Sequence, residues 1–280
     1  MKEIKLIALD LDGTLFDNNS LISPGNLKAI RAASDHGIHV VISTGRPLEG
    51  IPLDLFKDTG ISYAITANGS AIYEIATKNC LYENAMDTDL VVPVIRYLLT
   101  RDIHMDAFIG GKGYTPVQCV ANAQKLTVPA SIKKYIITTR TRVDDLVGFI
   151  EQNHLRVQKM TLNFYPDEHG ILIDREEVRT FLTSNPALAT VCGGYNNLEF
   201  TRKDASKGIA LKRLAELLSI PVESTMAIGD TENDLSIIQA AGIGVAMGNA
   251  ADHIKENADY VTTSNTEDGV AAAIGHFTGL

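Results

Sequence analysis

The sequence has few cysteines, and none of them stands in a spacing that would hold a metal ion. The three cysteines, Cys80, Cys119 and Cys192, are odd in number and far apart, which argues against a disulfide framework. We therefore expect buried free thiols in a reducing compartment, namely the cytoplasm. The seven histidines never form a pair such as His-x-x-x-His, so the sequence gives no support to a zinc site.

Long apolar runs and basic clusters are missing as well. No apolar stretch approaches the roughly 20 residues that a membrane helix needs, and the chain starts without a signal-peptide pattern, so we expect no membrane partner. The net charge is −9 and the pI is near 5.3. The densest basic spots, 133–134 and 140–142, are too short to follow a nucleic-acid backbone, so we also expect no nucleic-acid partner.

The composition that is present is that of an ordinary globular protein. The chain has 280 residues, of which 45% are hydrophobic and 21% are charged. This length allows one large domain or two of moderate size, each with its own core. Nothing in the composition specifies an oligomeric state.

Strand and helix patterns alternate at both ends of the chain. The first third predicts strands at 6–9, 38–43 and 63–66 and helices at 24–36 and 47–59. The last third predicts helices at 206–218 and 233–241 and strands at 225–228, 243–247 and 260–262. Such alternation with short connections indicates right-handed crossovers and an α/β fold with a Rossmann-like parallel sheet.

The middle of the chain has a different pattern, with longer and more polar strands such as 156–165. Two strand candidates, 104–109 and 114–120, are joined by a glycine-rich hairpin signal at 110–113. We expect an α+β unit with an antiparallel sheet, inserted into the parallel core. The predicted domains are a core at 1–83 and 188–280 and an inserted cap at 84–187.

The most informative segment is 5–15, where an apolar run ends in two aspartates and a glycine turn. Functional groups of open parallel sheets lie just past the carboxyl ends of such buried strands. Asp10 and Asp12 repel each other unless a cation or a proton lies between them, which favours a hard cation such as Mg2+. The alternative is a plain turn in which Asp caps backbone amides before Gly13.

Three further segments bring polar groups to predicted strand ends or helix starts. The segment 43–46 offers a hydroxyl, adjacent amides and the fork of Arg46, which together suit a phosphate group. Lys207 stands in the first turn of a helix, where it opposes the helix dipole and needs an anion nearby. The segment 229–234 adds two carboxylates and an amide.

Each of these segments also has a simpler interpretation. Ser-Thr-Gly is a common loop, a lone lysine is usually solvated, and Asp often caps a helix. Placement favours chemistry, because all four segments fall where a parallel sheet gathers its functional loops. Together they supply anionic metal ligands, a hydroxyl and a cation, which suits phosphoryl transfer.

In this order and at these intervals, the four segments resemble those of the haloacid dehalogenase-like hydrolase superfamily. The similarity spans nearly the whole chain and includes the segments 67–70, 246–250 and 263–270. The large insertion resembles the cap of the Cof-type branch, which is of the C2B kind. The resemblance implies a cytoplasmic, Mg2+-dependent phosphatase of small metabolites such as sugar phosphates, nucleotides or cofactor phosphates. It further implies an aspartyl-phosphate intermediate and a cap that selects the substrate.

The resemblance also implies individual roles. Asp10 would be the nucleophile and Asp12 the general acid and base, while Thr44 and Lys207 would bind the transferring phosphoryl group. The implied ligands of Mg2+ are Asp10, the backbone carbonyl of Asp12 and Asp230, with Asp234 in a supporting position. The residues implied to bind the substrate are Gly45, Arg46, Asn68 and Asn233. Apart from the resemblance, polar and aromatic residues at turns or strand ends of the insertion are candidates for contacts with the leaving group, namely His104, Asp106, Tyr114 and Tyr165. A solvated strand face would explain each of them as well. Thr231 and Ile238 depart from the residues common at these places, which should affect packing more than catalysis.

Two other functions stay open at this point. A phosphomutase on the same core would return the phosphoryl group to bound substrate instead of water. A non-catalytic phosphate-binding protein would not need a general acid, so the presence of Asp12 beside Asp10 argues against it. A pump-type ATPase is excluded because the chain has no membrane segments.

Overall fold

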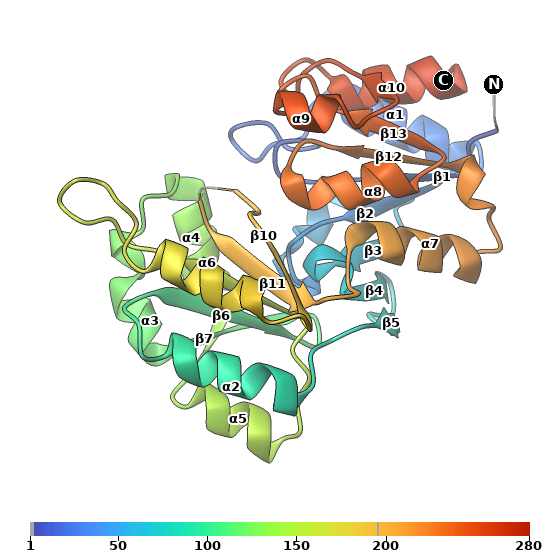
Figure 1. The fold of residues 1–280 in the computed structure, drawn as a ribbon. Helices are drawn as coiled ribbons and strands as arrows, with labels where there is room; N and C mark the ends of the chain where they lie inside the picture. The colour runs from blue at the N-terminus through green and yellow to red at the C-terminus, as the bar shows by residue number, and fades with distance from the viewer. Residues whose placement is uncertain (1–2, 195) are drawn as a thin grey trace. The chain divides into compact units, whose positions relative to one another are not determined.

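The computed structural model describes residues 3–194 and 196–280, and the chain divides into two compact units (Figure 1). The first unit consists of the residues up to Gly45, Pro52–Tyr82 and Ser206–Leu280, and the second of Arg46–Ile51 and Glu83–Ala205. The sequence prediction ends the insertion at residue 187. The second unit continues to Ala205 instead, because β10 (Leu188–Val191) and β11 (Leu198–Arg202) pair within its sheet.

The first unit is built on an eight-stranded sheet of order β14-β13-β12-β1-β2-β3-β4-β5. Its strands are β1 (Leu6–Leu9), β2 (His39–Ser43), β3 (Tyr63–Thr66), β4 (Ala71–Glu74), β5 (Cys80–Glu83), β12 (Thr225–Gly229), β13 (Ile243–Ala246) and β14 (Tyr260–Val261). The strands from β14 to β3 pair in parallel, while β4 turns back antiparallel to β3. The predicted α/β fold with a parallel core is confirmed. The β4–β5 edge was not predicted.

Helices cover both faces of this sheet (Figure 1). They are α1 (Pro24–Asp35), α7 (Lys207–Leu217), α8 (Leu235–Ala240), α9 (Asp252–Lys255) and α10 (Gly269–Thr278), with short 3-10 helices η3 (Ala67–Gly69), η5 (Val222–Ser224) and η6 (Glu232–Asp234). On one face, Leu211 and Leu214 of α7 pack into a buried cluster with alternate residues of β1 such as Leu6 and Ala8. Ser23 begins α1 by accepting a hydrogen bond from the amide of Asn26.

The predicted helix at 47–59 is wrong. The structure has two 3-10 helices there, η1 (Leu48–Gly50) and η2 (Leu53–Phe56). Pro52 separates them, because proline cannot donate a helical hydrogen bond and disfavours the helical conformation of the residue before it. Only η2 belongs to the first unit, whereas η1 lies in the second.

The second unit has a six-stranded sheet of order β10-β11-β9-β6-β7-β8, antiparallel except for the β7–β8 pair. Its other strands are β6 (His104–Ile109), β7 (Lys112–Pro116), β8 (Arg140–Val143) and β9 (Lys159–Asn163), and its helices are α2 (Thr88–Leu98), α3 (Val117–Asn122), η4 (Ala123–Lys125), α4 (Ala130–Thr139), α5 (Leu146–Gln152) and α6 (Arg175–Ser184). The predicted strand at 114–120 is too long. Pro116 ends the ladder, since it has no amide hydrogen to donate, and a helix follows.

The two faces of this second sheet differ in polarity. Alternate residues such as Met105, Met160 and Leu162 join a buried core with helix residues that include Ile95 and Ile150. Most of the residues between them on β6, β9 and β11 are polar, and six of these make up what we call the polar sheet face. Its members are His104, Asp106, Lys159, Thr161, Asn163 and Glu199.

The polar sheet face is buried, so its charged groups need partners within the fold. The ammonium of Lys159 lies 2.5 Å from a carboxylate oxygen of Glu199, and the Nε of Arg140 lies 2.8 Å from a carboxylate oxygen of Asp106. Unpaired, such charges would be strongly destabilising in the interior.

Among the helices of the described residues, none is long and apolar enough to cross a membrane.

Candidate active site

The predicted site residues of the first unit meet at the carboxyl edge of its parallel sheet. Asp10 directly follows β1, Thr44 follows β2 and Asp230 follows β12, and β1 lies between β2 and β12 in the sheet. Asn68 follows β3 on the other side of β2. The sheet order therefore gathers into one place residues that are up to 220 positions apart in the sequence.

Lys207 lies at the centre of this group. Its side chain is completely buried, and its Nζ lies 2.7 Å from an oxygen of Asp10 and 2.6 Å from an oxygen of Asp234. Nζ also donates to the side-chain oxygen of Asn233 at 3.4 Å. Burial alone would lower the pKa of Lys207, but the carboxylates of Asp10 and Asp234 raise it above its usual value. The lysine is thus a fixed cation, which the dipole argument for a first-turn lysine predicts.

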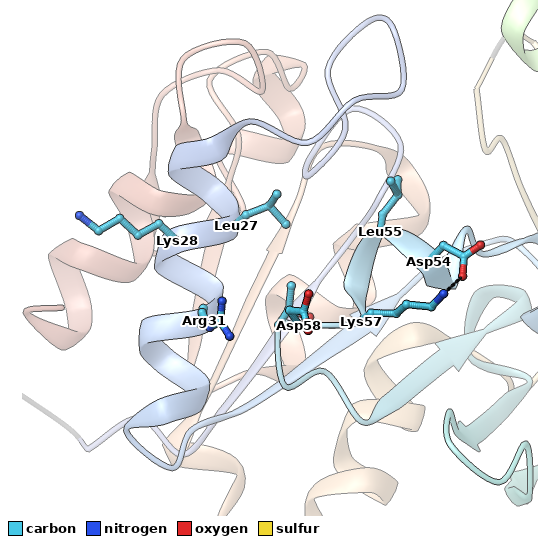
Figure 2. A pocket seen from close by; sticks show the side chains of 8 residues that line it. Leu27, Lys28, Arg31, Asp54, Leu55, Lys57 and Asp58 are labelled. Carbon is cyan, nitrogen blue, oxygen red and sulfur yellow. Dashed lines mark ion pairs between the residues drawn. The ribbon is translucent and has the colours of Figure 1, made fainter.

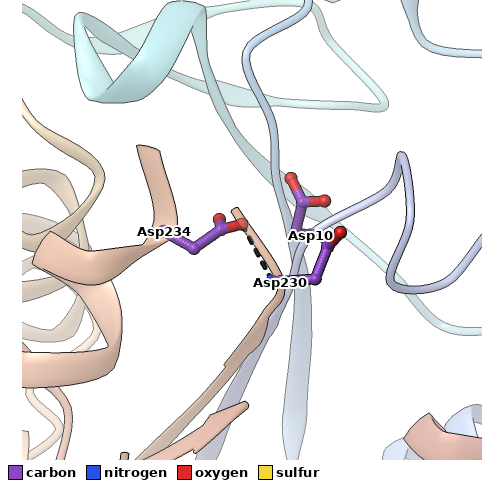
Figure 3. A group of neighbouring side chains, drawn as sticks. All are labelled: Asp10, Asp230 and Asp234. Atoms are coloured by element: carbon purple, nitrogen blue, oxygen red, sulfur yellow. Dashed lines mark hydrogen bonds between the residues drawn. The ribbon is translucent and has the colours of Figure 1, made fainter. Parts of the chain in front are cut away.

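Three carboxylates lie close together at this edge of the sheet (Figure 3). Asp10, Asp230 and Asp234 each offer an oxygen within 4.8 Å of the others. Burial raises the pKa of Asp10, and the charges of Asp234 and Asp230 raise it further while Lys207 opposes them. Burial and the charge of Asp234 likewise raise the pKa of Asp230 to about 7. The cluster carries more negative charge than the lysine neutralises, so it favours a proton or a cation.

The donor set fits Mg2+, because hard cations prefer carboxylate oxygens and retain waters that a phosphate can displace. The oxygens of Asp10 and Asp230 are the natural ligands. Asp234 is already engaged: one oxygen bonds Lys207, and the other accepts from the amides of Asp230 and Thr231, both at 3.1 Å. Asp234 thereby holds the loop that carries Asp230, which agrees with the supporting position expected for it.

The loop after β1 is fitted closely around Asp230. Gly13 has a positive φ of 88°, and a Cβ there would lie 2.3 Å from a carboxylate oxygen of Asp230, so only glycine suits this turn. The hydroxyl of Thr14 donates to Asp230 at 2.8 Å. The amide of Asn249 donates to the carbonyl of Gly13 at 2.9 Å. Thr14 and Asn249 were not among the predicted site residues, although both stand within segments that the sequence had singled out.

The remaining predicted residues of this unit surround the cluster at different depths. Asp12 is exposed, in contrast to the buried Asp10 two residues earlier. Thr44 is buried, and its carbonyl accepts from the amide of Asn68 at 3.3 Å. Asn68 has a left-handed backbone with φ 57°, and its side-chain oxygen accepts from Asn233 at 3.2 Å. The structure thus connects the segment after β2 to the Lys207 cluster through the two asparagines.

Arg46, which the sequence analysis grouped with Thr44 and Gly45, belongs to a different unit from these two residues in the structure. Gly45 belongs to the first unit, but Arg46 is grouped with the second. Its guanidinium lies over the ring of Tyr135 on α4, 4.5 Å from the ring centre, and donates to the carbonyl of Gly50 at 3.1 Å. No motif in the sequence signals this contact, because Arg46 and Tyr135 are far apart along the chain.

A surface hollow of about 360 Å3 is lined in part by α1 (Figure 2). It is lined by Leu27, Lys28, Arg31, Asp54, Leu55, Lys57, Asp58 and Thr59. Both charge signs are present, and Lys57 and Asp54 form an exposed ion pair at 2.6 Å. The hollow brings together none of the predicted catalytic groups, so the candidate site is the Lys207 cluster.

Comparisons with known proteins agree with this geometry. The model of the haloacid dehalogenase-like hydrolase family matches residues 7–274. The 5-amino-6-(5-phospho-D-ribitylamino)uracil phosphatase YcsE of Bacillus subtilis is 35% identical, over 98% of this chain and 96% of its own. The phosphatase YwpJ of the same organism is 33% identical, over 98% and 99%. A solved haloacid dehalogenase-like hydrolase from B. subtilis superimposes with a TM-score of 0.83 at 31% identity, covering 98% of this chain and all of that one.

The crowded carboxylates predict an unusual dependence of stability on pH. The pKa of Asp230 is raised from 3.8 to about 7 in the folded state, so the native protein binds more protons than the unfolded chain between about pH 4 and 7. The free energy of unfolding of the metal-free protein should therefore fall as the pH rises through this range. Asp230→Asn should stabilise the metal-free protein at pH 8 by on the order of 1–4 kcal/mol, with the gain shrinking toward pH 4.

Urea denaturation at pH 4, 6 and 8 in EDTA measures this effect. Excess Mg2+ should then stabilise the wild type more than Asp230→Asn, because only the wild type has the full ligand set. A variant that is less stable than the wild type at pH 8 in EDTA would contradict the charge-crowding account.

Proposed function

The chain belongs to the haloacid dehalogenase-like hydrolase family, and from this we propose that it is a Mg2+-dependent phosphatase acting through a phosphorylated Asp10. It is a hydrolase of phosphoric monoesters that acts on small phosphorylated metabolites. The proposal of mechanism rests on one observation above all. Lys207 is buried between Asp10 and Asp234, with Asp230 beside them.

In the proposed first step, a carboxylate oxygen of Asp10 attacks phosphorus and the ester oxygen leaves. Lys207 opposes the protonation of that carboxylate and orients it, because a hydrogen bond from an ammonium group favours the charged form. Asp12, which is exposed and thus reaches solvent and substrate, gives a proton to the leaving alkoxide. The hydroxyl of Thr44 and the ammonium of Lys207 stabilise the charge on the transferring group.

In the second step, Asp12 takes a proton from water, and the hydroxide attacks phosphorus and releases Asp10. Bound Mg2+, held by Asp10, Asp230 and the carbonyl of Asp12, would supply positive charge that offsets the charge of the phosphoryl group. Gly45, Arg46, Asn68 and Asn233 are proposed to contact the substrate. The second unit is proposed to select among substrates.

For the substrate, we propose a phosphate ester with a polar, polyhydroxylated leaving group, of the kind named for YcsE. The polar sheet face supports this choice. Its members Lys159, Glu199 and Asn163 carry donors and acceptors, and Glu199 and Asn163 each keep about 6% of their surface exposed for contact with a polar leaving group. Sugar phosphates, nucleotides and flavin mononucleotide share this polar character, and pyridoxal phosphate is the less hydroxylated candidate.

Substitution of the two motif acids tests the covalent mechanism. Asp10→Asn should abolish phosphate release, because an amide is a poor nucleophile and a weaker metal ligand. Asp12→Asn should lose at least about 100-fold in kcat, the usual contribution of general acid–base catalysis. Release of inorganic phosphate from p-nitrophenyl phosphate measures both.

The exposed helix residue Asp252 is a matched control, and Asp252→Asn should keep wild-type activity. Near wild-type turnover by Asp10→Asn would overturn the aspartyl-phosphate. Transfer of the label from a phosphorylated substrate to a second acceptor without release of inorganic phosphate would identify a phosphomutase instead.

Metal exchange tests the cofactor. EDTA should remove activity and Mg2+ should restore it, whereas Ca2+ should inhibit. Calcium is larger and takes more ligands, so it would let the second oxygen of Asp10 coordinate instead of attacking phosphorus. Full activity after exhaustive chelation would contradict the metal assignment.

A panel of phosphate esters tests the substrate proposal. We expect the value of kcat/KM for 5-amino-6-(5-phospho-D-ribitylamino)uracil to exceed that for p-nitrophenyl phosphate by at least about tenfold, since polar groups left unpaired by a poorer substrate cost affinity. Ribitol 5-phosphate, flavin mononucleotide and phosphoglycolate are matched comparisons. If the two-carbon ester phosphoglycolate had the highest kcat/KM, polar contacts with a larger leaving group would not determine specificity, and the substrate proposal would be wrong.

A further inference from the structure

The segment Arg46–Ile51 lies between two parts of the first unit in sequence but packs with the second. The amide of Glu49 donates to the carbonyl of Gly111 in the β6–β7 hairpin at 2.9 Å, and the carboxylate of Glu49 lies 3.2 Å from the ammonium of Lys112. Together these contacts fasten η1 to the β6–β7 hairpin. The short segment that follows the phosphate-binding Thr44 is therefore fixed by the second unit.

Tyr135 of α4 is the centre of this attachment. The guanidinium of Arg46 lies 4.5 Å from its ring centre, and that of Arg140 lies 4.7 Å from it. Arg140 is itself held by the carboxylate of Asp106 at 2.8 Å and lies 5.0 Å from the ring of Phe108. One aromatic ring thus joins Arg46 to a buried ion pair of the second sheet.

The backbone at Gly50 is shaped to admit this ring. A Cβ at Gly50 would lie 2.3 Å from the phenol oxygen of Tyr135, so any other residue there would collide with it. Gly50 also accepts the hydrogen bond of Arg46 through its carbonyl. The close approach of Gly50 and the stacking of Arg46 therefore depend on the same position of the Tyr135 ring.

We propose that Tyr135 is a positioning residue for phosphate binding, which acts by holding the guanidinium of Arg46 in place. The inference rests on the proposed function, in which Arg46 contacts the substrate. Arg46 is two residues after Thr44, so their Cα atoms are at most about 7 Å apart whatever the arrangement of the units. A free arginine loses much rotamer freedom on binding a phosphate, whereas one already stacked on a ring has lost it beforehand.

Binding of inorganic phosphate in the presence of Mg2+, measured by calorimetry, tests the inference without requiring turnover. Tyr135→Leu should weaken phosphate binding about tenfold, the order expected from a cation–π contact between partly desolvated groups. Tyr135→Phe keeps the ring and should bind like the wild type. In the Arg46→Gln background, Tyr135→Leu should have no further effect, because the residue it positions is absent.

Tyr97 is a matched control in the same unit. Its ring, on α2, lies 5.0 Å from the guanidinium of Arg101. Arg101 is remote in sequence from Thr44, so Tyr97→Leu should leave phosphate binding unchanged. If Tyr135→Leu fails to fold, Gly50→Ala displaces the ring from the other side and should weaken binding in the same Arg46-dependent way.

Independent effects of Tyr135→Leu and Arg46→Gln, or wild-type binding by Tyr135→Leu, would overturn the positioning role. So would the absence of any effect of Arg46→Gln. A wild-type protein that binds phosphate but releases none from its esters would overturn the proposed function alone, because the binding cycle is read without turnover.

Discussion

The site depends on one buried ammonium group. Lys207 can remain charged in the interior only because Asp10 and Asp234 lie within 2.7 Å of it. The same carboxylates fix the neighbouring loops, because Asp234 also accepts from the amides of Asp230 and Thr231 after β12. Removal of the lysine would leave buried carboxylates facing each other without a cation. The catalytic arrangement and the local stability of the sheet edge are therefore the same set of interactions.

Much of this site was predictable from the sequence, for a topological reason. A continuous apolar run such as Leu6–Leu9 specifies a strand buried on both faces, and parallel pairing then brings the ends of such strands to one edge. Asp10, Thr44 and Asp230 each stand directly after a strand, so strand order alone assembles them. The lysine was recognisable because a cation at the start of a helix is unfavourable without an anion.

The rest could not be predicted, because it depends on contacts between segments that carry no periodic signal. Pro52 breaks a helical pattern whose apolar spacing looks regular, and Pro116 ends a strand whose residues continue to favour extended structure. The return of the chain was placed at residue 188 because no strand was predicted at β10 or β11. The alternation of apolar and polar residues in β11 is in fact typical of a half-buried antiparallel strand, unlike the continuous apolar run of Leu6–Leu9. β11 pairs with β9, and the two strands contribute polar residues to the same face of the second sheet.

The Lys207 cluster and the buried ion pairs of the second unit differ in charge balance. In the second unit, the buried ions form one-to-one pairs, Lys159 with Glu199 and Arg140 with Asp106. Burial also lowers the pKa of His104, which keeps it neutral beside them. Such pairs fix the register of a polar interior and carry no residual charge. The Lys207 cluster is different, because three carboxylates share one ammonium. Excess negative charge in the interior is unfavourable unless a proton or a bound cation neutralises it. A divalent cation would neutralise the excess negative charge at this edge of the first sheet. The polar sheet face has no such excess, because its buried ions are paired one to one.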